Sequence, residues 1–314
     1  MVEGVSTSLD PARFGRVALL MGGWSAERAI SLKSGEAVLA ALRRLGVDVR
    51  PIDAGRDVLE VLEKGRFDRA FIILHGRGGE DGVIQGGLEL LGIPYTGSGV
   101  LGSALGMDKL RCKAIWGADG LPTPRYRRVT PDEGPREALG DLRLPVAVKP
   151  AHEGSSIGVS RVDREAEMEG ALAEAFRYDD EVLVEEWIEG AEYSVSLLEG
   201  RALPAVGLKP ARPFYDYAAK YESDDTCYLC PCGLPEGQEE ELGRLALAAF
   251  EAIGASGWGR VDFMVDGEGR PWLIEVNTVP GMTDHSLVPM AAAAAGIGFD
   301  ELVGRILATS LEEV

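Results

Sequence analysis

The chain has 314 residues, of which 46% are hydrophobic and 26% charged, and it carries a formal net charge of −19. This composition is that of a globular protein with room for two or three linked domains. Such an acidic chain repels nucleic acid and anionic membranes, and no stretch approaches the ~20 apolar residues of a membrane helix. We therefore expect no nucleic-acid partner and no membrane partner. A phosphate ligand would need locally placed Lys, Arg, backbone N–H groups or a metal.

The first 15 residues are polar and lack the apolar core of a secretory signal, which predicts a cytoplasmic protein with reduced thiols. Three cysteines, Cys227, Cys230 and Cys232, form a C-x-x-C-x-C cluster. A structural zinc site needs four ligands, and no histidine lies near the cluster in sequence. We interpret these cysteines as ordinary thiols on a loop.

Residues 1–97 alternate between strand and helix patterns. Residues 17–20 and 71–74 have the apolar character of buried strands, residues 47–52 are extended, and apolar residues at helical spacing predict a helix over 27–45. This order is typical of a small parallel sheet. We expect an N-terminal α/β domain that ends at the Gly-rich run 97–106.

Two further domains are expected, over residues 98–188 and 189–314, so that the fold class is α/β with α+β character. The central one should contain helices at 108–116 and 165–178 and strands at 146–149, 159–162 and 181–187. The C-terminal one should contain a helix at 239–253 and strands at 193–198, 259–265 and 272–277. The long, polar and aromatic segment 213–235 is typical of a functional lid.

The strongest chemical signal lies in the last two predicted strands. Period-two alternation places Arg260 and Asp262 on one face of the first strand, and Glu275 and Asn277 on one face of the second. A short Gly-containing linker predicts a hairpin that brings the four side chains together. Hard oxygen ligands such as these suit Mg²⁺, although a solvated hairpin face with an incidental ion pair is the alternative. The polar Gly/Pro loop 278–283 at the strand end favours a ligand site.

A second signal is Lys149, which ends a strand just before the small-residue loop 153–158, EGSSIG. Small side chains let backbone N–H groups approach a phosphate closely. The loop lacks the Gly-Lys-Ser/Thr ending of a P-loop, and alone it would be an ordinary β-turn. With Lys109 and Lys149 as local cations, phosphate binding becomes a competing interpretation.

Two weaker signals lie elsewhere. The strand end VLVEEWIEGAE carries Glu185 and Glu192 and has the groups to hydrogen-bond an adenine and a ribose, although acidic strand ends are common solvated features. The turn MGGWSAE resembles a dinucleotide fingerprint only superficially, because Trp24 replaces the second glycine. Glu27 in this turn either complements a helix dipole or receives a substrate ammonium.

Eight segments in order, from residue 22 to residue 291, resemble successive motifs of the bacterial D-alanine–D-alanine ligase family, which belongs to the ATP-grasp superfamily. They are GGWSAERAISLKSG, LHGRGGEDGVIQGGLELLGIPYTGSG, ALGMDK, VKPAHEGSSIGVS, EEWIEGAEYSV, FYDYAAKYESDDT, GWGRVDFMV and IEVNTVPGMTDHSLVPMA. The resemblance implies an ATP-grasp fold that holds ATP between the central and C-terminal domains. It implies a cytoplasmic homodimer that makes D-alanyl-D-alanine for peptidoglycan from D-alanine and ATP, through a D-alanyl phosphate, with Mg²⁺ or alternatively Mn²⁺.

The resemblance also implies a role for each matching residue. The metal ligands would be Asp262, Glu275 and Asn277. The ATP contacts would be Lys109, Lys149, Glu153, Gly154, Ser155, Ser156, Glu185, Glu186, Trp187, Ile188, Glu192 and Lys220. The catalytic residues would be Glu27, Ser155, Tyr221, Arg260, Gly281 and Ser286. The D-alanine contacts would be Glu27, His75, Arg260, Gly281, Ser286 and Leu287, with Lys220 also near the second D-alanine carboxylate. No role follows for His152 or for the cysteine cluster.

Two alternatives remain beside this reading. One is a ligase of the same superfamily that uses D-lactate as acceptor; Tyr221 argues against it, because relatives that make D-alanyl-D-lactate lack this tyrosine. The other is a nucleotide-binding module without turnover, which predicts a missing metal ligand or a missing arginine. Arg260 and the three expected metal ligands are all present.

Overall fold

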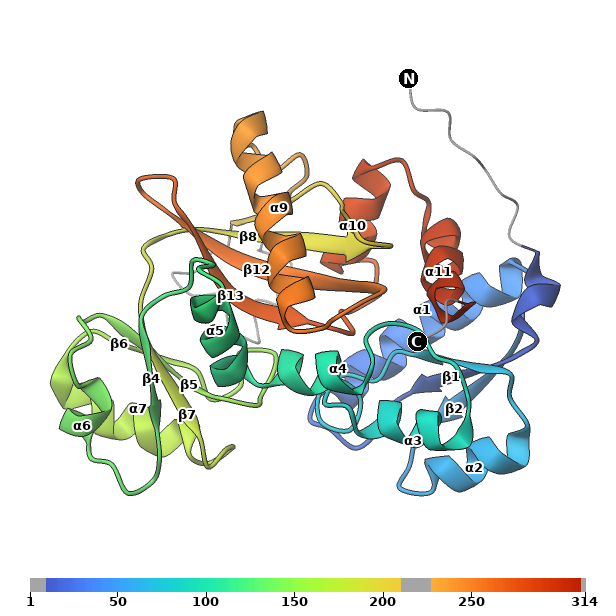
Figure 1. Ribbon diagram of the computed structural model, residues 1–314, viewed down its shortest axis with the longest axis horizontal. Helices are drawn as coiled ribbons and strands as arrows, with labels where there is room; N and C mark the ends of the chain where they lie inside the picture. Colours follow the sequence, from blue (N-terminus) through green and yellow to red (C-terminus); the bar gives the residue numbers. More distant parts are fainter. Residues whose placement is uncertain (1–9, 210–226, 312–314) are drawn as a thin grey trace.

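The computed structural model describes residues 10–209 and 227–311. These residues form three sheets, which are flanked by helices (Figure 1). The N-terminal sheet is parallel in the order β2-β1-β3, which confirms the predicted small parallel sheet. Its strands are β1 (Arg16–Met21), β2 (Asp48–Asp53) and β3 (Arg69–Ile72). Its helices are η1 (Pro11–Phe14), α1 (Arg28–Arg44), α2 (Val58–Gly65) and α3 (Val83–Leu91).

Helix α1 illustrates why this part of the sequence folds as it does. Val38, Ala41 and Leu42 repeat at helical spacing and are buried against the sheet. Ser31 lies on the same face, where its hydroxyl donates to the Ile73 carbonyl (2.7 Å) and accepts from the Gly22 N–H (2.9 Å). The helix ends before Gly46, whose φ of 77° a glycine adopts without strain.

The central sheet is antiparallel in the order β4-β7-β5-β6. The three predicted strands correspond to β5 (Val146–Pro150), β6 (Ser160–Val162) and β7 (Val182–Glu186), whereas β4 (Tyr126–Val129) was not predicted. Helices α6 (Pro135–Leu139) and α7 (Met168–Ala175) contribute to its core, with η2 (Glu165–Glu167) before α7. Helices α4 (Val100–Met107) and α5 (Lys109–Ala118) run between this sheet and the N-terminal sheet (Figure 1).

The third sheet has the order β11-β10-β8-β12-β13, with β9 paired to β8. The two strands of the predicted hairpin are β12 (Trp258–Asp266) and β13 (Pro271–Asn277), and they pair antiparallel. The other strands are β8 (Gly190–Leu198), β9 (Arg201–Ala202), β10 (Val206–Lys209) and β11 (Cys227–Leu229). Helix α9 (Glu236–Ala252) packs its Leu242, Leu245 and Ala249 into the core of this sheet.

The last two helices of the chain contribute to the core of the first sheet, and the first of them also packs on β8 and β10 of the third sheet (Figure 1). Val288 of α10 (Leu287–Ala294) and Leu302 and Ile306 of α11 (Phe299–Ala308) belong to the same hydrophobic core as the N-terminal strands, and η3 (Thr309–Leu311) follows. An ion pair between Arg44 of α1 and Asp300 of α11 (2.6 Å) lies at this contact. The expected division at residues 97 and 188 stays a prediction.

Among the described residues, no single helix is long and apolar enough to cross a membrane. The segments Leu287–Ala294 and Phe299–Leu311 reach that length and apolarity only together, across a bend of 106°. Both segments contribute buried side chains to the core described above.

Candidate active site

Two adjoining cavities open between the sheets. The first has a volume of about 90 Å³ and the second of about 230 Å³. Five of the described residues line both cavities and so form the boundary between them. The shared residues are Lys109, Glu192, Leu208, Asp262 and Glu275.

The hairpin brings the predicted polar face together. Arg260 lies opposite Asn277 and Asp262 opposite Glu275 in the β12–β13 register. The Arg260 guanidinium makes two 2.8 Å contacts with the Asp262 carboxylate, and the Asn277 amide donates to the same carboxylate (3.1 Å). Ser194 of β8, which the sequence analysis missed, donates to Asp262 from the other side (2.8 Å). Its position opposite Asp262 in the β8–β12 register is visible only once the sheet is known.

The residues present fit a magnesium ion. Asp262 is buried, and Glu275 lies 3.4 Å from the Lys109 ammonium, which disfavours a merely solvated hairpin face. In the described ranges, no group of three or more His, Cys, Asp or Glu side chains converges as a closed metal cage. Two carboxylates and one amide oxygen are what Mg²⁺ uses when waters and substrate phosphates complete its shell. The described cysteines of the C-x-x-C-x-C cluster are free thiols.

Two members of a buried charge cluster, Glu185 and Lys149, line the second cavity. Glu185 forms ion pairs with Lys149 and with Lys113, whose ammonium lies 2.6 Å from a Glu185 oxygen. Burial alone would raise the pKa of Glu185, but the two ammonium groups outweigh it and hold that pKa below its usual range. Burial lowers the pKa of Lys113. The sequence analysis missed Lys113, although it follows Lys109 by one helical turn on α5.

The loop 153–158 joins the two cavities. Its carbonyl at Glu153 accepts a 2.6 Å hydrogen bond from the Lys109 ammonium. Ser155 and Ser156 adopt positive φ values of 52° and 59°, which residues other than glycine rarely adopt. Such strain costs of order 1 kcal/mol per residue and persists where surrounding contacts fix the conformation. One such contact is the hydrogen bond that the Ser155 hydroxyl donates to the Glu27 carboxylate.

Glu27 occupies the N-cap position of α1 and is buried beside two other titratable groups. The Glu80 carboxylate accepts from the N–H groups of Gly76 (2.6 Å) and Val279 (3.2 Å). Burial, reinforced by the charge of Glu27, raises the pKa of Glu80 to about 8. The His75 Nδ1 lies 2.8 Å from the Val279 carbonyl and donates to it, and burial lowers the pKa of His75.

These contacts hold the loop 278–283 against the N-terminal sheet. Besides the two contacts at Val279, the Ser34 hydroxyl accepts from the Met282 N–H (3.1 Å). Gly281 lies between them, and a Cβ placed there would come within 2.9 Å of the Ser286 hydroxyl. Ser286 occupies the N-cap position of α10 without a capping hydrogen bond from its side chain, so the N–H of Leu287 belongs to the first helical turn, where N–H groups lack intrahelical acceptors.

The structure brings most of the predicted site residues together. The first cavity is lined by the predicted substrate residues and metal ligands, namely Glu27, His75, Ser155, Arg260, Asp262, Glu275, Asn277, Gly281, Ser286 and Leu287, and also by Gly154. The second is lined by predicted ATP residues, namely Lys109, Lys149, Glu153, Ser156, Glu185, Glu186, Trp187, Ile188 and Glu192. Lys220 and Tyr221, with most of the predicted lid, lie outside the described residues. Glu80 lines the first cavity and was not predicted, although an acid in a Gly-rich loop after a buried strand is a signal for it.

Comparisons with known proteins agree with this geometry. The family model described as "D-ala D-ala ligase C-terminus" matches residues 115–308, and "D-ala D-ala ligase N-terminus" matches residues 56–98. A D-alanine–D-alanine ligase from Alkalilimnicola ehrlichii is 60% identical over 304 residues, which cover 97% of each chain. The chain belongs to the D-alanine–D-alanine ligase family.

Solved structures of a D-alanine–D-alanine ligase and of a D-Ala:D-Ser ligase have the same fold. The Bacillus anthracis ligase complexed with ATP superimposes with a TM-score of 0.83 at 36% identity, covering 95% of this chain and 97% of the other. The VanG D-Ala:D-Ser ligase from Enterococcus faecalis has a TM-score of 0.83 at 28% identity, covering 94% and 99%. As a D-alanine–D-alanine ligase family member, the chain has the ATP-grasp fold and is an ATP-dependent ligase.

Proposed function

We propose that this chain joins two molecules of D-alanine into D-alanyl-D-alanine, a peptidoglycan precursor, and converts one ATP to ADP and phosphate in doing so. The observation that carries the proposal is the shared boundary of the two cavities. A buried cation, Lys109, and two buried or half-buried carboxylates, Asp262 and Glu275, stand between a nucleotide-sized cavity and a smaller cavity with a carboxylate and an arginine. A phosphoryl group passing from ATP to a small substrate has to cross this boundary.

The second cavity is suited to ATP. The Glu186–Ile188 backbone and Glu192 line it for the adenine and ribose, while Lys109 and Lys149 face the phosphate end. The loop 153–158 would cover the phosphates with its N–H groups. Asp262, Glu275 and Asn277 would hold Mg²⁺. When bound, this ion would offset the negative charge on the transferring phosphoryl group.

The first cavity is suited to D-alanine. The buried Glu27 would pair with the ammonium of the first D-alanine, whose carboxylate then attacks the γ-phosphorus of ATP. The P–O bond to ADP breaks, and the product is a D-alanyl phosphate. Because acyl phosphates hydrolyse readily, the closed loop 153–158 and the predicted lid would exclude water.

The second step joins the amino acids. The amine of the second D-alanine, as a free base, attacks the acyl carbon, and phosphate leaves with the electrons of the C–O bond. The oxyanion that forms in between would be stabilised by the Arg260 guanidinium and the Gly281 N–H. Ser286 and the Leu287 N–H, at the start of α10, would receive the carboxylate of the second D-alanine.

The proposal is tested by phosphate release from Mg-ATP in the presence of D-alanine, of L-alanine, or of D-alanine with D-lactate, with products identified by mass. We expect release with D-alanine alone and formation of D-alanyl-D-alanine. D-alanyl-D-lactate as the main product would instead show that Tyr221 does not set the acceptor. ATP binding without release in any mixture would point to a module without turnover.

Assembly and location complete the proposal. Three apolar side chains are strongly exposed on neighbouring helices, Val83 (60%) and Leu90 (88%) on α3 and Leu101 (65%) on α4. A second copy of the chain would bury these side chains, and their exposure on neighbouring helices therefore supports a homodimer. A monomeric mass by light scattering at micromolar concentration would contradict it. Use of ATP and free cysteines among the described residues support a cytoplasmic location.

A further inference from the structure

His152 lies between two carboxylates, one at each ring nitrogen. Its Nδ1 is 2.8 Å from an Asp179 oxygen and its Nε2 is 3.1 Å from an Asp108 oxygen. The His152 backbone N–H also donates to Asp179 (2.8 Å). A neutral imidazole carries one N–H and one lone pair, so it can donate to only one of the two carboxylates. The arrangement is fully satisfied only by the imidazolium, in which both nitrogens donate.

These contacts join three segments at the base of the ATP cavity. Asp108 is the N-cap of α5, where it accepts from the Arg111 N–H (3.0 Å), and Lys109 follows it directly. The Lys109 ammonium donates to the carbonyl of Glu153, the residue after His152 (2.6 Å). Asp179 lies in the segment between α7 and β7, and residues of β7 line the ATP cavity. The side chain of His152 is 29% exposed and lines neither cavity, so it would act through its neighbours.

We propose that His152 is a positioning residue, whose imidazolium holds Lys109 and the loop 153–158 in the arrangement that binds the ATP phosphates, so that loss of its proton weakens ATP binding. This inference rests on the proposed function, because it takes the loop and Lys109 to be the phosphate contacts. It assigns a role to the one histidine beside the phosphate loop.

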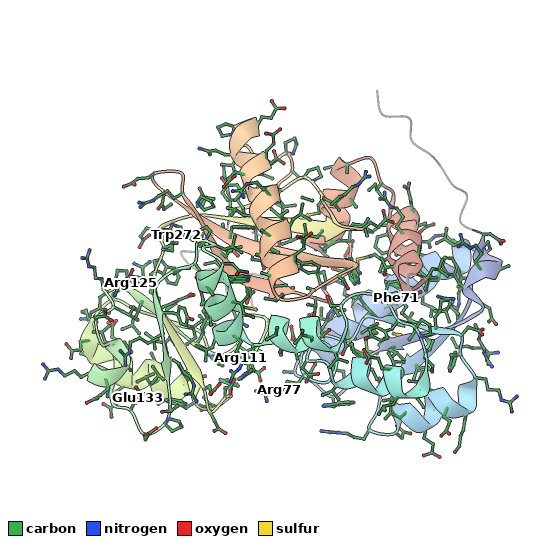
Figure 2. All side chains as sticks on the ribbon, in the orientation of Figure 1. Phe71, Arg77, Arg111, Arg125, Glu133 and Trp272 are labelled. Carbon is green, nitrogen blue, oxygen red and sulfur yellow. The ribbon has the colours of Figure 1, made fainter. Side chains whose placement is uncertain are left out.

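The charged groups around His152 come from several elements. Arg77, before α3, lies 3.7 Å from Asp179 and pairs with Glu153 (2.9 Å). Arg111 of α5 pairs with Asp108 (2.5 Å) and lies 3.4 Å from Glu181, which is also paired with Arg128 of β4. Figure 2 shows Arg77 and Arg111 on the same side of the molecule, in the region between the N-terminal and central sheets.

This environment favours the charged form of His152. The hydrogen bonds to Asp108 and Asp179 outweigh burial and raise the pKa of His152 to about 9. Contacts with the imidazolium and hydrogen bonds from Arg111 together outweigh burial at Asp108 and lower the pKa of Asp108 to about 2. Above the pKa of His152, one ring lone pair would face a carboxylate oxygen, which repels it. The contact between α5 and the loop 153–158 should then loosen.

The first measurement is the titration of His152 by NMR. The chain has three histidines, so His152→Asn assigns the resonance by its disappearance. We expect a midpoint near pH 9 in the ATP-free protein. Linkage requires that the pKa of His152 rise by about one unit when Mg-ATP binds, if deprotonation weakens ATP binding about tenfold. A midpoint near the ordinary value of 6.5 would overturn the proposal.

The second measurement is the Kd of Mg-ATP without D-alanine, by calorimetry from pH 7 to pH 10. The affinity of the wild type for Mg-ATP should fall about tenfold as the pH rises through the midpoint of His152 deprotonation, by the same linkage. His152→Arg, which stays charged, should not weaken there, and His152→Asn should be weak already at pH 7. His285→Asn is the matched control, because His285 is exposed and its one ion-pair contact among the described residues is the neighbouring Asp284 (3.7 Å). The affinity of this variant for Mg-ATP should follow that of the wild type.

The outcomes separate this proposal from the ligase assignment. Identical pH profiles for the wild type, His152→Arg and His152→Asn would overturn the role of His152 and leave the ligase assignment intact. A profile that follows His152, together with no phosphate release on adding D-alanine, would refute the ligase assignment alone. No ATP binding at any pH would overturn both.

Discussion

Replacing Glu185 with glutamine should lower the stability of the folded protein, and this loss should be measurable without any substrate. Glu185 is the only acid in ion-pair contact with Lys113 and Lys149 among the described residues, and all three side chains are buried. Lys113 has a relative exposure of 0%, and its ammonium also donates to the Thr123 hydroxyl (2.6 Å). In Glu185→Gln, two neighbouring buried ammonium groups lose their counter-charge.

The magnitude follows from the cost of a broken buried ion pair, which is about 3–5 kcal/mol. Unfolding entropy is about 2.1 cal/mol/K per residue, so the 314-residue chain melting as one unit gains about 0.66 kcal/mol/K. A loss of about 3 kcal/mol then lowers the Tm by about 5 °C. The fall would be larger if the central sheet melted on its own, because fewer residues would share the entropy.

The pH dependence of this loss is a sharper test than its size. Burial already lowers the pKa of Lys113, and removing Glu185 should lower it further. The unfolded state then binds more protons than the folded state, so stability of the variant rises with pH. We expect the Tm difference between wild type and Glu185→Gln to narrow from pH 7 toward pH 10.

The assay is scanning calorimetry without ATP across that pH range. The second variant is Lys113→Met in the Glu185→Gln background, which removes one of the two unpaired charges and should recover part of the lost Tm. The reasoning is refuted by a fall below about 1 °C, which corresponds to well under 1 kcal/mol. A difference that widens with pH, or a double variant less stable than Glu185→Gln, would refute it equally.

Three further predictions concern the first cavity. Asp262→Asn should lower kcat by about a hundredfold or more, because it weakens metal placement; unchanged turnover in a steady-state assay would disprove the metal assignment. Glu27→Gln should raise the KM of the first D-alanine far more than that of ATP, since glutamine can still accept from Ser155 but carries no charge; equal effects on both KM values would refute the ammonium role. Glu80→Gln should flatten the stability of the protein between about pH 4.5 and pH 8. A carboxylate whose pKa is raised from 4.5 to about 8 binds more protons folded than unfolded in this window, so wild-type stability falls as pH rises through it. The Tm of both proteins is measured at intervals of one pH unit. The same dependence of Tm on pH in the wild type and in Glu80→Gln would contradict this.

The hairpin face could be predicted from sequence because every signal for it is local. Period-two alternation fixes the faces of β12 and β13, and a short linker fixes their pairing. The register shift between Asp262 and Phe263 was not predictable, but it lies on the far side of Asp262 from Arg260 and leaves the polar face intact. Strand β4 escaped prediction because YRRV is short and half-exposed, without a buried run.

The rest of the site could not be predicted because its contacts join residues far apart in the chain. Glu80 accepts from Val279 across 199 positions, and Ser34 accepts from Met282 across 248. A local pattern can mark Glu80 as a polar loop residue and Ser34 as a residue of α1, but it cannot show which distant backbone group each one contacts. The packing of α11 on α1 is of the same kind: its apolar stripe predicts a buried face, but not which core receives it.

The contact between Glu27 and Ser155 gives the two substrates a physical means of affecting each other. Glu27 is fixed at the start of α1, whereas Ser155 belongs to the loop that would cover the ATP phosphates. If the ammonium of D-alanine binds at Glu27 as proposed, it would compete for the carboxylate that accepts from Ser155 and so change the free energy of closing the loop. Because coupling between two binding sites is reciprocal, ATP would then change the affinity for D-alanine by the same factor. The positive φ values of Ser155 and Ser156 are consistent with this view, because such strain persists where surrounding contacts fix the backbone, and Glu27 supplies one such contact at Ser155.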